Sequence, residues 1–292
     1  MMKFFVTGIC GQLGYDVMNE LKRQGYEVVG SDILKSAELQ LDITDKFAVD
    51  RVLNELKPDV VIHCAAWTAV DAAEDAENKK IVYAVNVSGT YNIAVACKRL
   101  DCKMIYISTD YVFSGEGVEA WKATCKNFAP LNYYGETKLK GEFSVAETVE
   151  KFFIVRVSWV FGINGKNFIN TMLNIGRKHS CVRVINDQIG TPTYTVDLAR
   201  LLVDMAKSEK YGYYHATNEG GYVSWYDFCC EIYRQSGLST IVIPVTTEEY
   251  GLNKALRPLN SRLDKSELRI NGFKLLPDWK DAIKRYLKEA NS

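Results

Sequence analysis

Tyr134 and Lys138 are the two residues of this 292-residue chain whose types and spacing most clearly suggest catalysis. They lie four residues apart in a segment with a helical pattern, so both side chains project from one face. A free phenol has a pKa of about 10, too high for efficient proton transfer near pH 7. A nearby ammonium would lower that pKa by stabilising the phenolate. A Tyr-x-x-x-Lys spacing also occurs by chance, so its weight depends on Ser108 and Thr109, which precede it by about 25 residues and could offer a hydroxyl to the reacting oxygen.

A glycine-rich segment near the N-terminus predicts a dinucleotide-binding site. Gly8, Gly11 and Gly14 have the spacing G-x-x-G-x-x-G and lie between an apolar run and a helical pattern. Without Cβ atoms the backbone can turn tightly and approach a pyrophosphate. The N–H groups at the start of the helix favour an anion. A purely structural turn is the alternative, but the strand–turn–helix context favours the binding site.

Asp32 ends the second predicted strand, 18 residues beyond Gly14. A carboxylate there can accept hydrogen bonds from ribose hydroxyls and would repel a 2′-phosphate. The sequence therefore predicts NADH or NADPH as cofactor, with NADH slightly favoured; a solvated Asp at a strand end is the alternative. Asp42 and Ile43 follow a predicted third strand and could flank the adenine, although an exposed turn Asp fits as well.

Alternating strand and helix patterns in the first half would position these residues. Runs that are apolar on both faces are typical of central parallel strands, and the βαβα order places helices on both faces of one sheet, joined by right-handed crossovers. We therefore expect an α/β fold, a doubly wound, Rossmann-like parallel sheet with a smaller C-terminal α/β substrate domain. The predicted strands are residues 3–7, 27–30, 60–64, 104–108 and 152–157, and the predicted helices are 15–24, 45–56, 78–99 and 134–150.

The pattern loosens after about Trp159, which suggests a second domain. We expect residues 1–160 to bind the dinucleotide and 161–292 mainly to bind the substrate, with about 191–212 returning to the first domain. Helical patterns cover 197–207 and 224–236, and short strands are expected near 182–185, 213–216 and 241–245.

Composition argues against several classes of protein. The 36 Lys and Arg residues balance 36 Asp and Glu residues, whereas a nucleic-acid binder normally has a basic excess. No apolar run approaches the roughly 18 residues of a membrane helix, and no His/Cys cluster has zinc spacing. The start is too short for a signal peptide. The eight cysteines have no framework spacing, so we expect reduced thiols and a cytoplasmic protein.

These motifs together resemble an extended short-chain dehydrogenase/reductase, and more closely the dTDP-4-dehydrorhamnose reductase family. The resemblance runs from residue 3 to about residue 286. Its most specific parts are the blocks 108–113 and 186–193. The other blocks that carry it are 65–71, 130–138, 156–160 and 257–263.

The resemblance implies reduction of the C4 keto group of dTDP-4-dehydro-L-rhamnose to dTDP-L-rhamnose by NADH or NADPH. Tyr134 would donate the proton, Lys138 would assist it and hold the nicotinamide ribose, and Thr109 would tune it. The implied cofactor residues are Gly8, Gly11, Gln12, Leu13, Gly14, Asp32, Asp42, Ile43, Ala65, Ala66, Trp67, Thr68, Ile107, Tyr134 and Lys138. The implied substrate residues are Thr109, Asp110, Tyr134 and Trp159, with Arg257 added as a candidate for the diphosphate.

Each supporting residue has a plainer interpretation. Trp159 could be core packing, and Arg257 could be a solvated surface residue. Asn86 matches an Asn that supports the active site in the wider superfamily, but could make an ordinary helix hydrogen bond. His63 stands where relatives often carry Asn and is expected to be a hydrogen-bonded strand residue.

Other aspects of the function stay open at this stage. Some family members use Mg²⁺ bound at a dimer contact, but the sequence shows no equivalent carboxylate cluster, so no metal site is predicted. A monomer and a homodimer fit equally. The alternatives are another sugar-nucleotide reductase or epimerase on the same scaffold, or a non-catalytic regulatory relative, against which the intact Tyr134, Lys138 and Thr109 argue.

Overall fold

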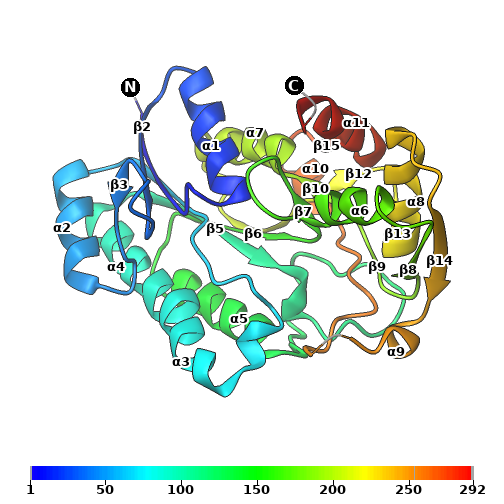
Figure 1. Cartoon of the computed structure of the whole chain (residues 1–292). Helices are drawn as coiled ribbons and strands as arrows, with labels where there is room; N and C mark the ends of the chain where they lie inside the picture. Colours follow the sequence, from blue (N-terminus) through cyan, green and yellow to red (C-terminus); the bar gives the residue numbers. More distant parts are fainter. Residues whose placement is uncertain (1, 253, 291–292) are drawn as a thin grey trace.

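A seven-stranded parallel sheet forms the centre of the computed structural model, which describes residues 2–252 and 254–290 (Figure 1). The strand order is β11-β6-β5-β4-β1-β2-β3, and every neighbouring pair is parallel. The order reverses between β1 and β4, which is where ligands bind in doubly wound sheets. The strands are β1 (Lys3–Thr7), β2 (Glu27–Asp32), β3 (Leu39–Gln40), β4 (Val60–His63), β5 (Lys103–Thr109), β6 (Phe152–Val157) and β11 (Gly212–His215). The predicted Rossmann-like fold is confirmed.

Helices cover both faces of this sheet, as Figure 1 shows. Phe4 and Ile62 pack with the helices of one face, whereas Phe5 and Val61 pack with those of the other. Successive residues thus enter two different cores, which explains why the strands are apolar at every position. The first face carries α1 (Gln12–Arg23) and α7 (Thr195–Ala206); the second carries α2 (Lys46–Leu56), α4 (Thr90–Leu100) and α5 (Tyr133–Ala146).

The helix expected at 78–99 differs from the prediction. It is helical from residue 76 to residue 100, but α3 (Ala76–Tyr83) and α4 are joined by a π-helical turn, Ala84–Gly89. Such turns displace one residue from the regular ladder and are frequent at functional sites. The helix expected at 134–150 ends earlier, at Ala146, beyond which Val149 N–H still bonds to Val145 O at 2.9 Å.

The second half of the chain has its own hydrophobic core. Phe161, Phe228, Trp279 and Tyr286 are among its buried residues. Its helices are α6 (Phe168–Gly176), α8 (Trp225–Ser236), α9 (Thr247–Tyr250), α10 (Ser266–Ile270) and α11 (Trp279–Ala290). Its strands are β7 (Val160–Phe161), β8 (Cys181–Ile185), β9 (Ile189–Gly190), β10 (Thr193–Tyr194), β12 (Asn218–Glu219), β13 (Val223–Ser224), β14 (Ile241–Val245) and β15 (Leu276–Asp278), which pair two by two.

Two segments of the second half pack on the main sheet, one from α7 to β11 and one that includes Leu268 of α10 and Leu276 of β15. Helix α7 contacts α1, and β11 extends the sheet beside β6. The division into two domains near residue 160 stays a prediction. Within the described ranges, no helix is both long and apolar enough to cross a membrane.

Candidate active site

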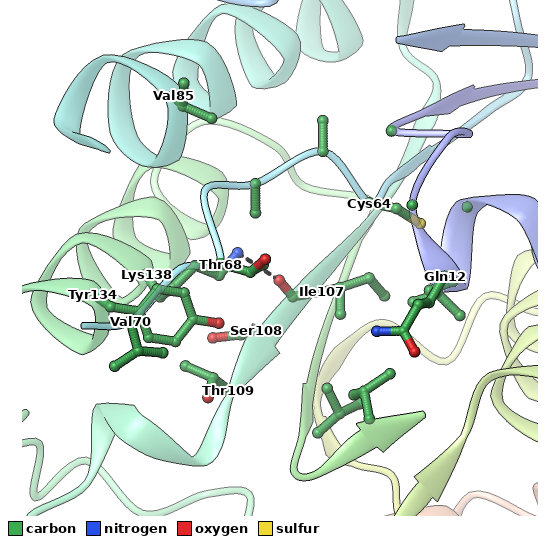
Figure 2. A pocket seen from close by; sticks show the side chains of 18 of the residues that line it. Gln12, Cys64, Thr68, Val70, Val85, Ile107, Ser108, Thr109, Tyr134 and Lys138 are labelled. Atoms are coloured by element: carbon green, nitrogen blue, oxygen red, sulfur yellow. Dashed lines mark hydrogen bonds between the residues drawn. The ribbon is translucent and has the colours of Figure 1, made fainter. Parts of the chain in front are cut away.

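A cavity of about 760 Å³ lies at the carboxyl ends of the central strands and is lined by residues of both halves of the chain. This volume falls within the usual range of ligand sites. Figure 2 shows Ser108, Thr109, Tyr134 and Lys138 on one side of it and Gln12 on the other. The predicted site residues that line it are Gly8, Gly11, Gln12, Leu13, Gly14, Asp32, Asp42, Ile43, Ala65, Ala66, Thr68, Ile107, Thr109, Asp110, Tyr134, Lys138, Trp159 and Arg257.

Trp67 is the one predicted site residue that does not line the cavity. Its indole N–H donates to Ala69 O at 3.1 Å, and its role as a cofactor contact stays a prediction. Its backbone is fixed by Asn86, which accepts from Trp67 N at 2.8 Å and donates to Trp67 O at 3.2 Å. Asn86 also donates to Thr137 Oγ1 at 3.0 Å, so this residue of the π-helical turn ties the loop after β4 to α5. That tie supports the predicted structural role of Asn86.

The glycine loop approaches its neighbours too closely for a larger residue. Gly8 has φ +74°, and a Cβ there would lie 2.7 Å from Ala65 N. On the far side, Gln12 Oε1 accepts from Gly162 N at 2.8 Å, and Asn164 Nδ2 donates to Cys10 O at 2.9 Å. The loop after β7 is therefore fastened to the glycine loop, a contact that sequence reasoning did not predict.

Asp32 lies beside the glycine loop, as its predicted role requires. Its Oδ2 accepts from Cys10 N at 3.0 Å, and its Oδ1 accepts from Leu34 N at 3.2 Å. Asp42 lines the cavity, but its Oδ1 also accepts from the backbone and hydroxyl of Thr44 at 2.9 and 2.7 Å. Asp42 therefore also stabilises this turn, which fits its alternative interpretation as a turn residue.

Lys138 is buried on α5 and held in place by β5. Asn132 starts the helix by accepting from Gly135 N at 2.8 Å, which places Tyr134 in the first turn and Lys138 one turn further on. The Lys138 ammonium donates to Ile107 O at 2.7 Å, the dashed bond in Figure 2. Burial lowers the pKa of Lys138 to about 7, although the charge of Glu142 opposes the shift.

Tyr134 departs from the prediction that its pKa is lowered. Loss of water around the phenol raises its pKa above the usual value of 10, the Asp110 carboxylate raises it further, and the Thr109 hydroxyl opposes them. The physical reason for the difference is desolvation, which the sequence pattern does not reveal. Tyr134 is consequently a protonated phenol that can donate its proton.

Asp110 is a carboxylate that lines the cavity next to Thr109. It is buried, and its Oδ1 accepts from Thr109 Oγ1 at 3.0 Å. Among the described residues its Oδ2 has no hydrogen-bond partner, and burial raises its pKa to about 6. A buried polar atom without a partner points to a polar ligand.

An ion pair behind the cavity was missed by sequence reasoning. Arg156 donates to Glu142 through Nε at 2.8 Å and Nη2 at 2.7 Å, and both side chains are buried. Ser108, which lines the cavity, donates to the same carboxylate at 2.5 Å. The available signal was the i, i+4 spacing of Lys138 and Glu142, which puts both on one face of α5.

Trp159 has a strained backbone and a fixed ring. Its φ of +49° is rare for a bulky residue and is characteristic of functional sites. Its ring stacks on Trp225 with centroids 3.8 Å apart and planes at 16°. A Cβ at Gly190 would lie 2.9 Å from that ring, so only glycine fits beside it. The indole therefore lines the cavity and also packs against the hydrophobic core of the second half.

Arg257 lines the cavity and is not a solvated surface residue. Its Nη2 donates to Asp71 Oδ2 at 2.6 Å, and its Nη1 donates to Asp71 Oδ1 at 3.0 Å. His63 accounts for none of the site chemistry. Its ring is hydrogen-bonded to Thr7 at 2.7 Å and Thr90 at 3.1 Å, which confirms a structural strand residue.

Comparison with known proteins identifies the family. The family described as RmlD substrate binding domain matches residues 2–292. The chain belongs to this family. It is 38% identical to the spore coat polysaccharide biosynthesis protein SpsK of Bacillus subtilis, covering 100% of this chain and 99% of that protein. It is 37% identical to dTDP-4-dehydrorhamnose reductase of Aggregatibacter actinomycetemcomitans, covering 97% and 98%.

A solved structure of the same kind is equally similar. The chain is 39% identical to dTDP-4-dehydrorhamnose reductase of Bacillus anthracis, solved in complex with NADP, with a TM-score of 0.92 and coverage of 99% of this chain and 100% of that one. The RmlD family membership that the resemblance implied is thereby confirmed.

Proposed function

We propose that this RmlD-family chain reduces the C4 keto group of dTDP-4-dehydro-L-rhamnose to dTDP-L-rhamnose, with a reduced nicotinamide dinucleotide as hydride donor. The observation that carries the proposal is that Tyr134, Thr109 and Lys138 share one cavity with the glycine loop. Similarity to named reductases over nearly the whole chain supports the same reaction.

The residues present fit a dinucleotide. Gly8 leaves no room for a Cβ where the backbone must approach the ligand, and Asp32 places a carboxylate on the cavity beside it. We assign the other predicted cofactor residues to the same ligand: Gly11, Gln12, Leu13, Gly14, Asp42, Ile43, Ala65, Ala66, Trp67, Thr68, Ile107, Tyr134 and Lys138. When bound, the cofactor supplies the hydride, and the chain supplies position and electrostatics.

The chain's own contribution to the reduction is a proton and a shaped charge environment. Tyr134 is held protonated by desolvation and by the Asp110 charge, so it can give its proton to the oxygen that gains charge at C4. Thr109 opposes that shift, so the balance of the two neighbours sets how readily the proton leaves. Lys138 holds a ribose hydroxyl with the ammonium that Ile107 O orients.

On the substrate side we assign the sugar to Thr109, Asp110 and Trp159 and the diphosphate to Arg257. A guanidinium can bind phosphate oxygens in a bidentate manner. We also propose that NADH is used at least as well as NADPH, because the Asp32 carboxylate would repel a 2′-phosphate. The NADP complex of the Bacillus anthracis protein makes the comparison of both cofactors necessary.

We assign no metal site in this proposal. Across residues 2–252 and 254–290, no three His, Cys, Asp or Glu side chains come together as metal ligands. One chain forms the whole cavity, so a monomer or a homodimer would serve. We place the protein in the cytoplasm, a proposal supported by its eight free cysteines.

A coupled assay tests the function. Purified protein is mixed with dTDP-4-dehydro-6-deoxyglucose, the epimerase that forms the L-rhamnose precursor, and NADH or NADPH. We expect reduced nicotinamide to be consumed in proportion to dTDP-L-rhamnose formed. In a parallel reaction without the added epimerase, formation of an epimerised sugar without net consumption of reduced nicotinamide would indicate the epimerase alternative. No turnover with either cofactor in the complete mixture would contradict the proposal.

A further inference from the structure

Asp71 joins two parts of the chain that flank the cavity. It follows the loop after β4 that carries Ala65, Ala66 and Thr68. Its Oδ1 accepts from the backbone N–H groups of Lys254 at 3.1 Å and Ala255 at 3.0 Å. We call residues 254–257 the strap. Together with the two bonds from the Arg257 side chain, Asp71 receives four hydrogen bonds from the strap.

Other contacts also hold the strap, and each of them involves a single strap residue. The Lys254 ammonium pairs with Asp75, and both side chains are well exposed. Asn132 Nδ2 donates to Leu256 O at 2.7 Å, which connects the strap to the start of α5. Among the residues that the structure describes, Asp71 alone bonds both the strap backbone and the guanidinium. The hydrogen bonds from Arg257 hold the pKa of the Asp71 carboxyl below its usual range, so Asp71 is charged.

Arg257 retains free donors despite this pairing. A guanidinium has five N–H groups, and three bonds are made, two to Asp71 and one from Nη1 to Ala255 O at 3.2 Å. Two N–H groups remain, on Nε and Nη2, and Tyr111 is a further hydrogen-bond partner of the guanidinium, which leaves at least one N–H group for a ligand in the cavity. Arg257 also interacts with Tyr111, whose ring packs edge-on against Tyr134 with centroids 5.8 Å apart. Tyr111 thus lies between the guanidinium and Tyr134, the proposed proton donor.

We propose that Asp71 is a positioning residue that sets the affinity for the substrate's diphosphate by fixing Arg257 and the strap. The inference rests on the proposed function, because it takes Arg257 as the diphosphate ligand. A long side chain that is already ordered loses less conformational entropy when it binds, and a planar bidentate pair fixes the direction of the remaining N–H groups. The opposite possibility is that the Asp71 charge repels the diphosphate and weakens binding.

Calorimetric titration with dTDP tests the inference without turnover. We expect Asp71→Asn to raise the Kd for dTDP about tenfold, equivalent to about 1.4 kcal/mol, and to raise KM for the dTDP-sugar similarly. The Kd for NADH and kcat should change less than about twofold, because Asp71 acts on the diphosphate alone. Asp71→Glu, which keeps a carboxylate, should recover part of the affinity.

Three further substitutions separate positioning from a general effect. Asp75→Asn removes the exposed ion pair between Asp75 and Lys254 of the strap. It should leave the Kd for dTDP within about twofold of the wild-type value. In an Arg257→Ala background, Asp71→Asn should add little, because its effect passes through Arg257. Thermal unfolding of each variant checks that it folds, and Arg257→Lys, which keeps the charge but loses the bidentate pair, should reproduce the weaker binding.

Several results would overturn the inference. A lower Kd for dTDP in Asp71→Asn would show that the Asp71 charge opposes diphosphate binding, and an unchanged Kd would show that Asp71 has no role in it. An equal increase in the Kd for NADH would show a merely structural effect. A wild-type protein that does not bind dTDP would also overturn it. A wild-type protein that binds dTDP, shows the Asp71 effect and yet reduces no ketosugar would contradict the proposed reaction while leaving the positioning role intact.

Discussion

The Glu142 carboxylate and the Arg156 guanidinium form a bidentate pair directly behind the active-site cavity, with relative side-chain exposures of 0% and 1%. Buried charges are tolerated only when they are paired and fully hydrogen-bonded. Here the pair is completed by the Ser108 hydroxyl on the carboxylate and by Ala123 O, which accepts from Arg156 Nη1 at 3.1 Å. A buried ionic network thus lies behind Ser108, which lines the cavity.

Glu142→Gln is expected to lower the free energy of unfolding by about 3–5 kcal/mol, because it leaves the Arg156 charge buried without a counter-ion. Denaturant titration measures this loss. The matched control is Glu136→Gln on the same helix, whose pair with Lys140 is half exposed and should cost less than about 1 kcal/mol. Equal effects of the two variants would show that the buried pair has no special weight.

Tyr134→Phe should lose about 10²–10⁴-fold in kcat while binding NADH normally, since only the transferable proton is removed. Steady-state kinetics and a fluorescence titration of NADH measure the two effects. Tyr133→Phe is the adjacent control, because within the described part of the chain that hydroxyl bonds only to Lys79 O, at 3.3 Å on the surface. Turnover near the wild-type rate in Tyr134→Phe would remove this residue from the mechanism.

The affinity for NADH should depend on the protonation of Lys138. Its pKa is lowered to about 7, so the ammonium is present below that pH and is lost as the pH rises through it. We expect the Kd for NADH to increase between about pH 6 and pH 9, with the change centred near the Lys138 pKa. In Lys138→Met, binding should be weaker throughout and lose this dependence. An identical pH profile in wild type and variant would contradict the ribose-holding role.

Cofactor choice tests the assignment of Asp32. Wild-type protein should show kcat/KM for NADH at least equal to that for NADPH. Asp32→Ala should narrow the difference in kcat/KM between the two cofactors. The substitution removes the repulsion that acts on the 2′-phosphate of NADPH, and it removes the hydrogen bonds to the ribose of NADH. A wild-type preference for NADPH of tenfold or more, about 1.4 kcal/mol, would mean that a cation such as the exposed Lys35 outweighs Asp32.

The local sequence was sufficient to predict the main sheet and the glycine loop. Phe4 and Phe5 enter opposite cores, so a run without alternation correctly indicates a strand covered on both faces. Helix α11 was missed although Trp279, Ile283, Tyr286 and Leu287 have the spacing of an amphipathic helix and are all buried. The spacing of these apolar residues is by itself sufficient to predict the helix.

Other features depend on contacts distant in the sequence. Asp71 and Arg257 are 186 residues apart, and no local pattern relates them. The π-helical turn holds Asn86 to Thr137, 51 residues away, which a periodic pattern cannot show. The raised pKa of Tyr134 results from burial by the assembled cavity, so the expectation from Lys138 alone was wrong.

The transfer of hydride to C4 is the central claim, and isotopic labelling tests it most directly. The reaction is run with NADH that carries deuterium at both C4 positions of the nicotinamide, and the sugar product is analysed by NMR and mass spectrometry. The account predicts dTDP-L-rhamnose with one deuterium, located at C4 of the sugar. A product without deuterium at C4, or conversion of the sugar without oxidation of NADH, would contradict it.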